Sequence, residues 1–187
     1  MKPLLAPALC AALALAACNN KSNDTATGDN AVVVSETPSA AATTTAAPTT
    51  PQAFIDTAAS SDMYEIEAGK LAQQMGHGEN VKAFGAMMVK DHTASSKKLK
   101  DAVGQAGNGL SVPIAMAPAQ QAQLDALKNA GDSFDMTYAQ QQVAAHQAAL
   151  TLLTDQSNSG TVPQLKSFAA GVLPVVQHHY EEAKKLP

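Results

Sequence analysis

The stretch "GAMMVKDHTASSKKL", residues 85–99, shows most plainly how this chain folds. Its small and apolar residues recur every three or four positions, so that one face carries Gly85, Met88, His92, Ser95 and Leu99. This spacing is typical of an amphipathic helix whose one face is buried. His92 stands in the middle of that face. The stretch therefore predicts a core-facing helix with a histidine among its buried positions.

The same spacing recurs along most of the chain and predicts four long helices and a short one. The long helices are expected at residues 52–75, 79–106, 133–156 and 162–186, and the short helix at 118–130. Glycine-rich breaks such as "GHGE", residues 76–79, separate them. Four helices with one apolar face each pack best as a bundle. We therefore expect an all-α, ferritin-like four-helix bundle with an extra short helix between the second and third long helices.

The connection between the second and third long helices bears on the topology. Its loop, residues 107–118, reaches at most about 40 Å, while the helix before it is about 42 Å long. With the short helix added, the chain can cross over along the bundle, as in ferritin-like topologies. A simple up-and-down arrangement remains the alternative.

Residues 1–17 have the pattern of a secretory signal peptide. A basic Lys2 precedes an apolar run that is shorter than the roughly 20 residues of a membrane span. "LAAC", residues 15–18, resembles a bacterial lipobox, in which the cysteine carries lipid. We therefore expect a lipoprotein held to the membrane through Cys18, on the periplasmic face of the cell envelope. Asn19, in place of an aspartate, favours the outer membrane.

Residues 18–51 form a segment rich in Thr, Ala and Pro that has little apolar surface to bury. Such composition predicts a disordered tether, with a span of about 30 Å. Residues 52–187 are then the folded domain. They contain no cysteine, which excludes disulfides and thiolate metal sites in this domain.

The charge of the chain argues against one class of partner. The net charge is −4 and every basic residue is lysine. Nucleic-acid binding would need a clustered basic face, so we expect no nucleic acid as a partner.

Each long helix places one possible metal ligand among its core positions: Glu65, His92, His146 and His179. Carboxylate and neutral imidazole suit a divalent transition metal, and such sites are built inside four-helix bundles. The first three residues each lie 13 positions after the expected start of their helix. His179 is out of step with His146 by 7 positions, or about 10 Å along the helix axis. Convergence of all four is therefore not assumed.

A classical di-iron site is disfavoured, because that chemistry uses Glu-x-x-His on two helices. Valines, Val89 and Val176, stand three positions before His92 and His179. Asp91 is expected at the rim, where it can orient a neighbour. A buried polar network without any metal is the competing interpretation. The remaining histidines, His77 and His178, are expected in solvent.

Four segments resemble one bacterial family: "SSDMYEIEAGKLAQQ", "VKAFGAMMVKDHTASSKKL", "FDMTYAQQQVAAHQAALTLL" and "LKSFAAGVLPVVQHHYEEAKKL". This family is the one catalogued as domain of unknown function 4142, described as secreted or envelope proteins with a ferritin-like bundle. The resemblance extends over residues 54–186. Carried over by position, its motif residues are Glu65, Asp91, His92, Phe134, Asp135, His146, Leu173, Pro174 and His179. The resemblance implies a fold and a compartment, and no established activity.

Taken together, the sequence favours a non-enzymatic envelope lipoprotein, a binding or stress-related module that has residues suited to a metal ion. No catalytic or organic-cofactor residues are predicted. A metal-dependent redox or protective enzyme that uses the Glu/His cluster is one alternative. A structural or adaptor protein that binds another envelope component is a second.

Overall fold

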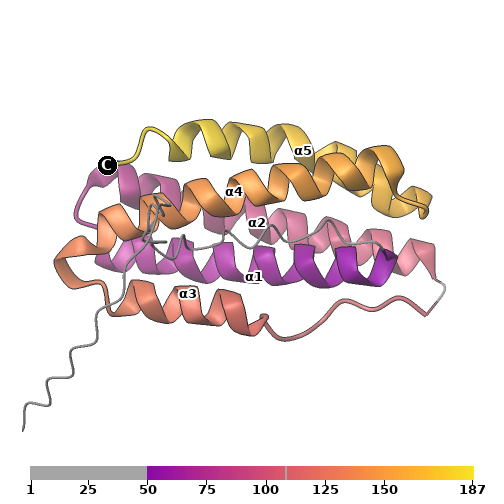
Figure 1. Ribbon diagram of the computed structural model, residues 1–187, viewed down its shortest axis with the longest axis horizontal. Helices are drawn as coiled ribbons and strands as arrows, with labels where there is room; N and C mark the ends of the chain where they lie inside the picture. Colours follow the sequence, from indigo (N-terminus) through magenta and orange to yellow (C-terminus); the bar gives the residue numbers. More distant parts are fainter. Residues whose placement is uncertain (1–49, 108) are drawn as a thin grey trace, which may run out of the picture. The chain divides into compact units, whose positions relative to one another are not determined.

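The computed structural model describes residues 50–107 and 109–187. These residues form five α-helices and one 3₁₀ helix and contain no strand (Figure 1): α1 (Pro51–Met75), α2 (Glu79–Ala106), α3 (Pro118–Lys128), η1 (Gly131–Ser133), α4 (Phe134–Ser159) and α5 (Pro163–Ala183). The all-α prediction is confirmed. The predicted signal peptide, Cys18 and nearly all of the predicted tether lie outside the described residues. None of the described helices combines the length and hydropathy of a membrane span.

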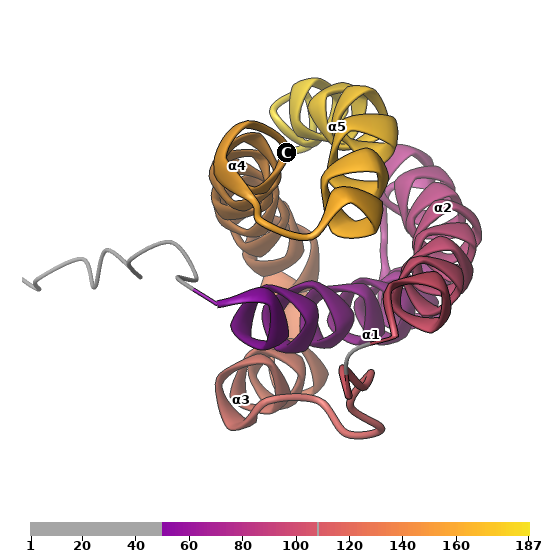
Figure 2. The same cartoon turned by 90° about the vertical axis from the view of Figure 1, so that its right-hand side faces the viewer.

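The helix ends follow from local residue chemistry. Thr50 caps α1, since its Oγ1 accepts the N–H of Ala53 at 3.2 Å. α1, α3 and α5 each begin with a proline, a residue suited to the first helical turn because it lacks an N–H. α4 ends at Ser159, three positions beyond the expected end, and Gly160 follows it. Pro174 lies inside α5, whose axis changes direction along its length in the end-on view (Figure 2).

The bundle has the crossover topology. α2 and α4 run parallel to each other, while α1 and α5 run in the opposite direction (Figure 1). After α2, the segment from Gly109 to Ser133 carries the chain back along the bundle to the start of α4. α1, α2, α5 and α4 therefore surround one interior, and α3 lies outside them against α1 and α4 (Figure 2).

The crossover segment is fastened to α1 by side-chain hydrogen bonds. Gln52 Nε2 donates to the carbonyl oxygen of Ser111 at 2.8 Å, and the Ser111 N–H donates to Gln52 Oε1 at 3.2 Å. Further along, the Ala117 N–H donates to Ser60 Oγ at 2.8 Å. These bonds satisfy backbone groups that a loop would otherwise leave to water, and they lead the chain into α3.

α1 and α2 approach closely at two glycines. A Cβ atom on Gly69 would lie 2.6 Å from the carbonyl oxygen of Gly85, and one on Gly85 would lie 2.6 Å from the carbonyl oxygen of Gly69. No side chain fits at either position. The absence of Cβ atoms therefore sets the separation of these two helices.

The turn between α1 and α2 is held by the start of α4. Gly78 precedes α2 and has no side chain to cap it, but the Asp135 carboxylate accepts the N–H groups of Gly78 at 2.8 Å and His77 at 2.9 Å. Asp132 lies inside η1, and Ser133 is the N-cap residue of α4.

The core consists of two apolar clusters, one toward each end of the bundle. The first is centred on Phe54, Leu99, Leu153 and Phe168, and the second on Tyr64, Phe84, Phe134 and Tyr138. Between them lies a layer of buried polar residues, described in the next subsection.

Gly69→Ala is expected to lower the free energy of unfolding by about 1–3 kcal/mol, because the new Cβ forces α1 and α2 apart. Urea unfolding followed by circular dichroism measures this change. Gly104→Ala is the matched control, since nothing lies within 4 Å of its Cβ position in α2. The control should gain up to about 1 kcal/mol from alanine's helix propensity. Equal responses at the two glycines would contradict the close approach.

Candidate metal centre

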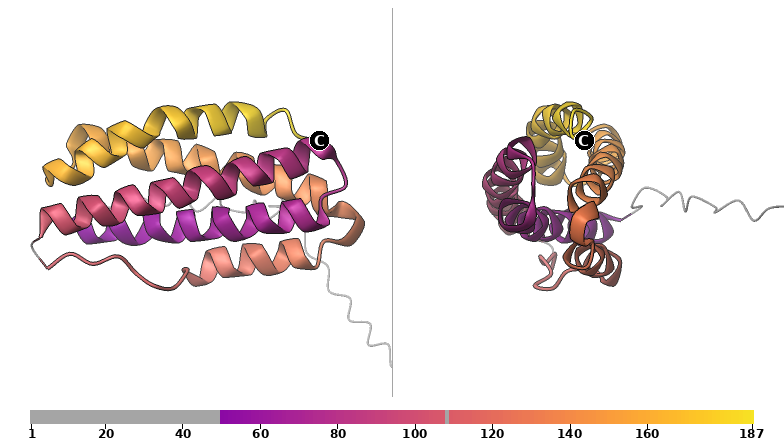
Figure 3. Two further views of the ribbon diagram at one scale, coloured as in Figure 1. Left: turned by 180° about the vertical axis from the view of Figure 1, so that it is seen from behind. Right: turned by 90° about the vertical axis from the view of Figure 1, so that its left-hand side faces the viewer.

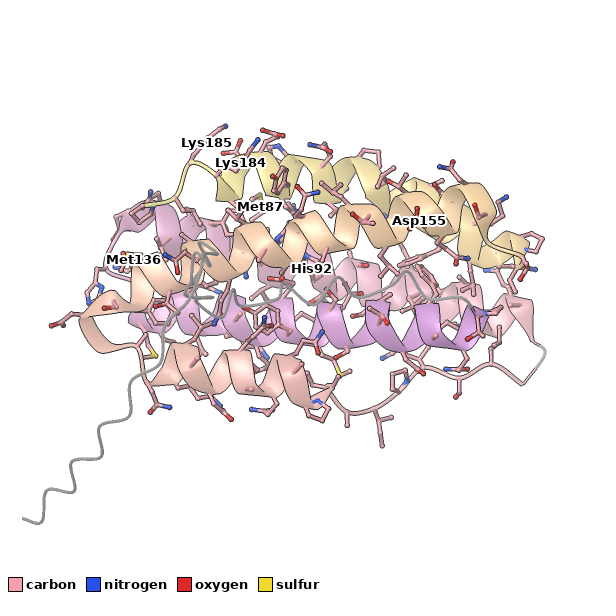
Figure 4. The ribbon with its side chains drawn as sticks, in the orientation of Figure 1. Met87, His92, Met136, Asp155, Lys184 and Lys185 are labelled. Atoms are coloured by element: carbon pink, nitrogen blue, oxygen red, sulfur yellow. The ribbon has the colours of Figure 1, made fainter. Side chains whose placement is uncertain are left out.

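The polar layer brings together side chains from all four long helices. Its buried members are Asp62, Glu65, His92, Gln142, His146 and His179. His92 lies in the interior of the bundle, while Lys184 and Lys185 point outward near the C-terminal end (Figure 4). The layer interrupts an otherwise apolar core, so its hydrogen bonds must be satisfied internally.

Three of these residues are histidines whose rings meet. His92 from α2, His146 from α4 and His179 from α5 have ring centroids 5.4–5.8 Å apart. One ring nitrogen from each lies within 4.8 Å of those from the other two. The offset that the sequence predicted between His146 and His179 does not keep His179 out of the group.

One nitrogen of each ring is fixed by an acceptor. His92 Nδ1 bonds to Asp62 Oδ1 at 2.8 Å, and His179 Nε2 bonds to Asp91 Oδ2 at 3.1 Å. His146 Nδ1 donates to the backbone carbonyl oxygen of Gln142 at 2.9 Å. A carbonyl or an ionised carboxylate can only accept, so each of these ring nitrogens carries the proton.

The opposite nitrogens have no partner among the described residues. His92 Nε2, His146 Nε2 and His179 Nδ1 are buried, and no donor from residues 50–107 or 109–187 reaches them. In a neutral imidazole with one N–H, the second nitrogen carries a lone pair. A buried polar atom without a partner costs about 1–3 kcal/mol. With all three rings neutral, the group offers three such lone pairs, which suit a ligand that accepts electron pairs, namely a metal ion.

The pKa values keep two rings neutral at pH 7. Burial lowers the pKa of His146 to about 3, aided by the charge of His92. Burial lowers the pKa of His179 to about 4, although the hydrogen bond that its ring donates to Asp91 opposes the shift. At His92 burial also lowers the pKa, but the hydrogen bond to Asp62 and the charge of Glu65 outweigh it, so its pKa is raised. Asp62 thereby makes His92 the most basic ring of the three.

Glu65, the fourth predicted ligand, occupies a different place in the layer. Its Oε2 accepts the side-chain N–H of Gln142 at 2.7 Å, and it is not a member of the group of three. Burial raises the pKa of Glu65 to about 7, although the charge of His92 opposes the shift. Glu65 thus contributes charge and hydrogen bonding beside the histidines.

The orienting carboxylates were only partly foreseen. Asp91 was expected at the rim, and it lies there with its side chain 26% exposed, bonded to His179. Asp62 was missed as a site residue. The available signal was its position three before Glu65 on the same helix face. An ionised side chain is seldom buried unless it is paired, and the sequence does not show that His92 is the partner of Asp62. His77 and His178 are exposed, as predicted.

The fold and the site define a helical-bundle protein with a buried three-histidine group that fits a metal ion. The chain belongs to the family described as "Domain of unknown function (DUF4142)", whose model matches residues 35–186. A comparison with curated proteins gave no match.

Two solved structures share the fold. "CopM in the Cu(II)-bound form" has 19% sequence identity and a TM-score of 0.60, over 72% of this chain and 93% of that one. "CopM in the Cu(I)-bound form" has 18% identity and a TM-score of 0.60, over 73% and 94% of the two chains.

Gln142→Met is expected to lower the free energy of unfolding by about 1–3 kcal/mol, because it leaves the buried carboxyl group of Glu65 without its donor. Thermal and urea unfolding measure the loss. Gln140→Met is the matched control, since Gln140 lies on the exposed side of the same helix. A control that loses as much stability would show that the effect is not specific to the polar layer.

Proposed function

We propose that this protein binds one transition metal ion, copper in the first place, through His92, His146 and His179. The observation that carries the proposal is the set of three buried, partnerless ring nitrogens that come from three different helices. Each ring is held by an acceptor on its far nitrogen, so the group is organised before any ion arrives. Metal-binding histidines characteristically have such an acceptor behind them.

The chemistry of the donors favours this class of ion. Imidazole suits copper, zinc, iron and nickel, whereas magnesium and calcium prefer oxygen. Copper(II) stands highest in the usual order of affinity among divalent ions. The likeness in fold to CopM in its two copper-bound forms supports copper as the first ion to test.

The proposed role is binding at the cell envelope. The lipobox-like "LAAC" supports lipid attachment at Cys18, and the segment before the bundle supports a tether to the membrane. A module of this kind would hold a copper ion close to the outer membrane. Incorporation of radiolabelled palmitate, and its loss in Cys18→Ala, tests the attachment.

The untagged protein is expected to bind one copper ion per chain, and its Tm should rise by roughly 5–10 °C with the ion at 100 times its Kd. The rise follows because the assembled group exists only in the folded state. Elemental analysis after gel filtration gives the stoichiometry, and calorimetry gives the Tm.

Replacing His92, His146 or His179 singly by Gln should abolish the shift. His77→Gln is the matched control, because the His77 side chain is 60% exposed and lies in the α1–α2 turn. No bound metal and no shift with copper, zinc, nickel or iron would refute the proposed function. If His77→Gln and His92→Gln changed the metal-induced shift in Tm equally, the assignment of the ligands would be refuted.

Asp62→Asn is expected to weaken copper binding by about 10–100-fold, because the substitution removes the carboxylate that orients His92. A competition titration against a chelator of known affinity measures the change. Asp56→Asn, on the exposed face of the same helix, should leave the Kd unchanged. A Kd unaffected by Asp62→Asn would show that this carboxylate does not support the site.

A further inference from the structure

The seams between neighbouring helices differ in how well they are closed. The α1–α2 seam is closed by the contact between Gly69 and Gly85. α4 packs extensively against α5, and α3 covers the seam between α1 and α4. None of the described helices covers the α2–α5 seam, and these two helices lie side by side on one face of the bundle (Figure 3).

A cavity lies in this uncovered seam, directly beside the histidines. Its volume is about 30 Å³ and its lining includes Asp91, His92, Ser95, Lys98, Val175 and His179. A cavity of this size has room for at least one water molecule. Two of the three candidate ligands therefore border a space that is also lined by residues of the protein surface.

The seam opens again further along the same two helices. A groove of about 490 Å³ is lined by Lys98 and Asp101 of α2 and by Gln164 and Gly171 of α5. Lys98 borders both spaces, so the groove and the cavity adjoin. The α2–α5 seam is thus hollowed on both sides of Lys98.

We propose that the metal ion reaches and leaves the three histidines through the α2–α5 seam, past Lys98 and Asp91. This inference rests on the proposed function. The Asp91 carboxylate lines the cavity, is in part exposed and also accepts the hydrogen bond of the His179 ring, so it offers an entering cation an anionic group beside the histidines. Lys98, which borders both the cavity and the groove, places a positive charge at the entrance to the cavity and opposes the approach of a cation.

A side chain that fills the cavity tests the path. Ser95→Leu should slow the uptake of Cu²⁺ and its release to EDTA together, each by about tenfold, and leave the Kd nearly unchanged, because the Kd is the ratio of the two rates. Stopped-flow absorbance or quenching of tyrosine fluorescence measures both rates. Ala94→Leu is the matched control, because it adds a larger side chain at the adjacent, exposed position of α2.

A change of charge at the mouth provides a second test. Lys98→Glu should speed the uptake of Cu²⁺ several-fold at low ionic strength and lose this advantage in high salt, where charges are screened. Lys100→Glu makes the same change at an exposed position that borders neither space, and it should have a smaller effect.

The outcomes separate this inference from the proposed function. A parent protein that binds no metal overturns both. A parent protein that binds copper, with unchanged rates in folded Ser95→Leu and equal effects of Lys98→Glu and Lys100→Glu, overturns the path alone. If circular dichroism shows that Ser95→Leu does not fold, Val175→Phe takes its place, because Val175 borders the cavity and is already 39% exposed.

Discussion

Each of the two nitrogens of a buried imidazole ring needs a hydrogen-bond partner or a ligand, and this requirement organises the centre of the bundle. Asp62 of α1 holds His92 of α2, and Asp91 of α2 holds His179 of α5. His146 uses the carbonyl oxygen one turn earlier in its own helix. Two of these hydrogen bonds thus join neighbouring helices, and they fix the positions of those helices relative to one another along the bundle axis. The three nitrogens that remain, one on each ring, are buried without a partner among the described residues.

The crossover decides which helices can share the site. It places α2 beside α5, so that Asp91 and His92, adjacent in sequence, can act on different neighbours: Asp91 on His179, and His92 on Asp62 and the ring cluster. The crossover also carries α3, which shields α1 and α4. The bundle is left with one weakly covered face, and that face borders two of the three histidines.

Periodicity predicted most of the fold. The predicted bounds of α2 agree with the observed ones, because a glycine marks each end of this helix. The apparent offset of His179 came from misplaced ends of the neighbouring helices. His146 lies 13 residues before the end of α4, and His179 lies 16 residues after the start of α5, so the mismatch shrinks from 7 residues to 3.

Periodicity could not predict which side chains hydrogen-bond to one another. Asp62 meets His92 across 30 residues and Gln142 meets Glu65 across 77, and such pairings depend on tertiary packing rather than on helix spacing.

The bundle is also two helical hairpins, and the histidines are divided between them. α1 packs against α2, and α4 against α5, more extensively than either hairpin packs against the other. His92 belongs to the first hairpin, whereas His146 and His179 belong to the second. The Asp135 carboxylate clasps the hairpins at one end. An ion held by all three rings would clasp them again at mid-length, so that loading the protein would act as a cross-link and its loss would let the two halves part more readily.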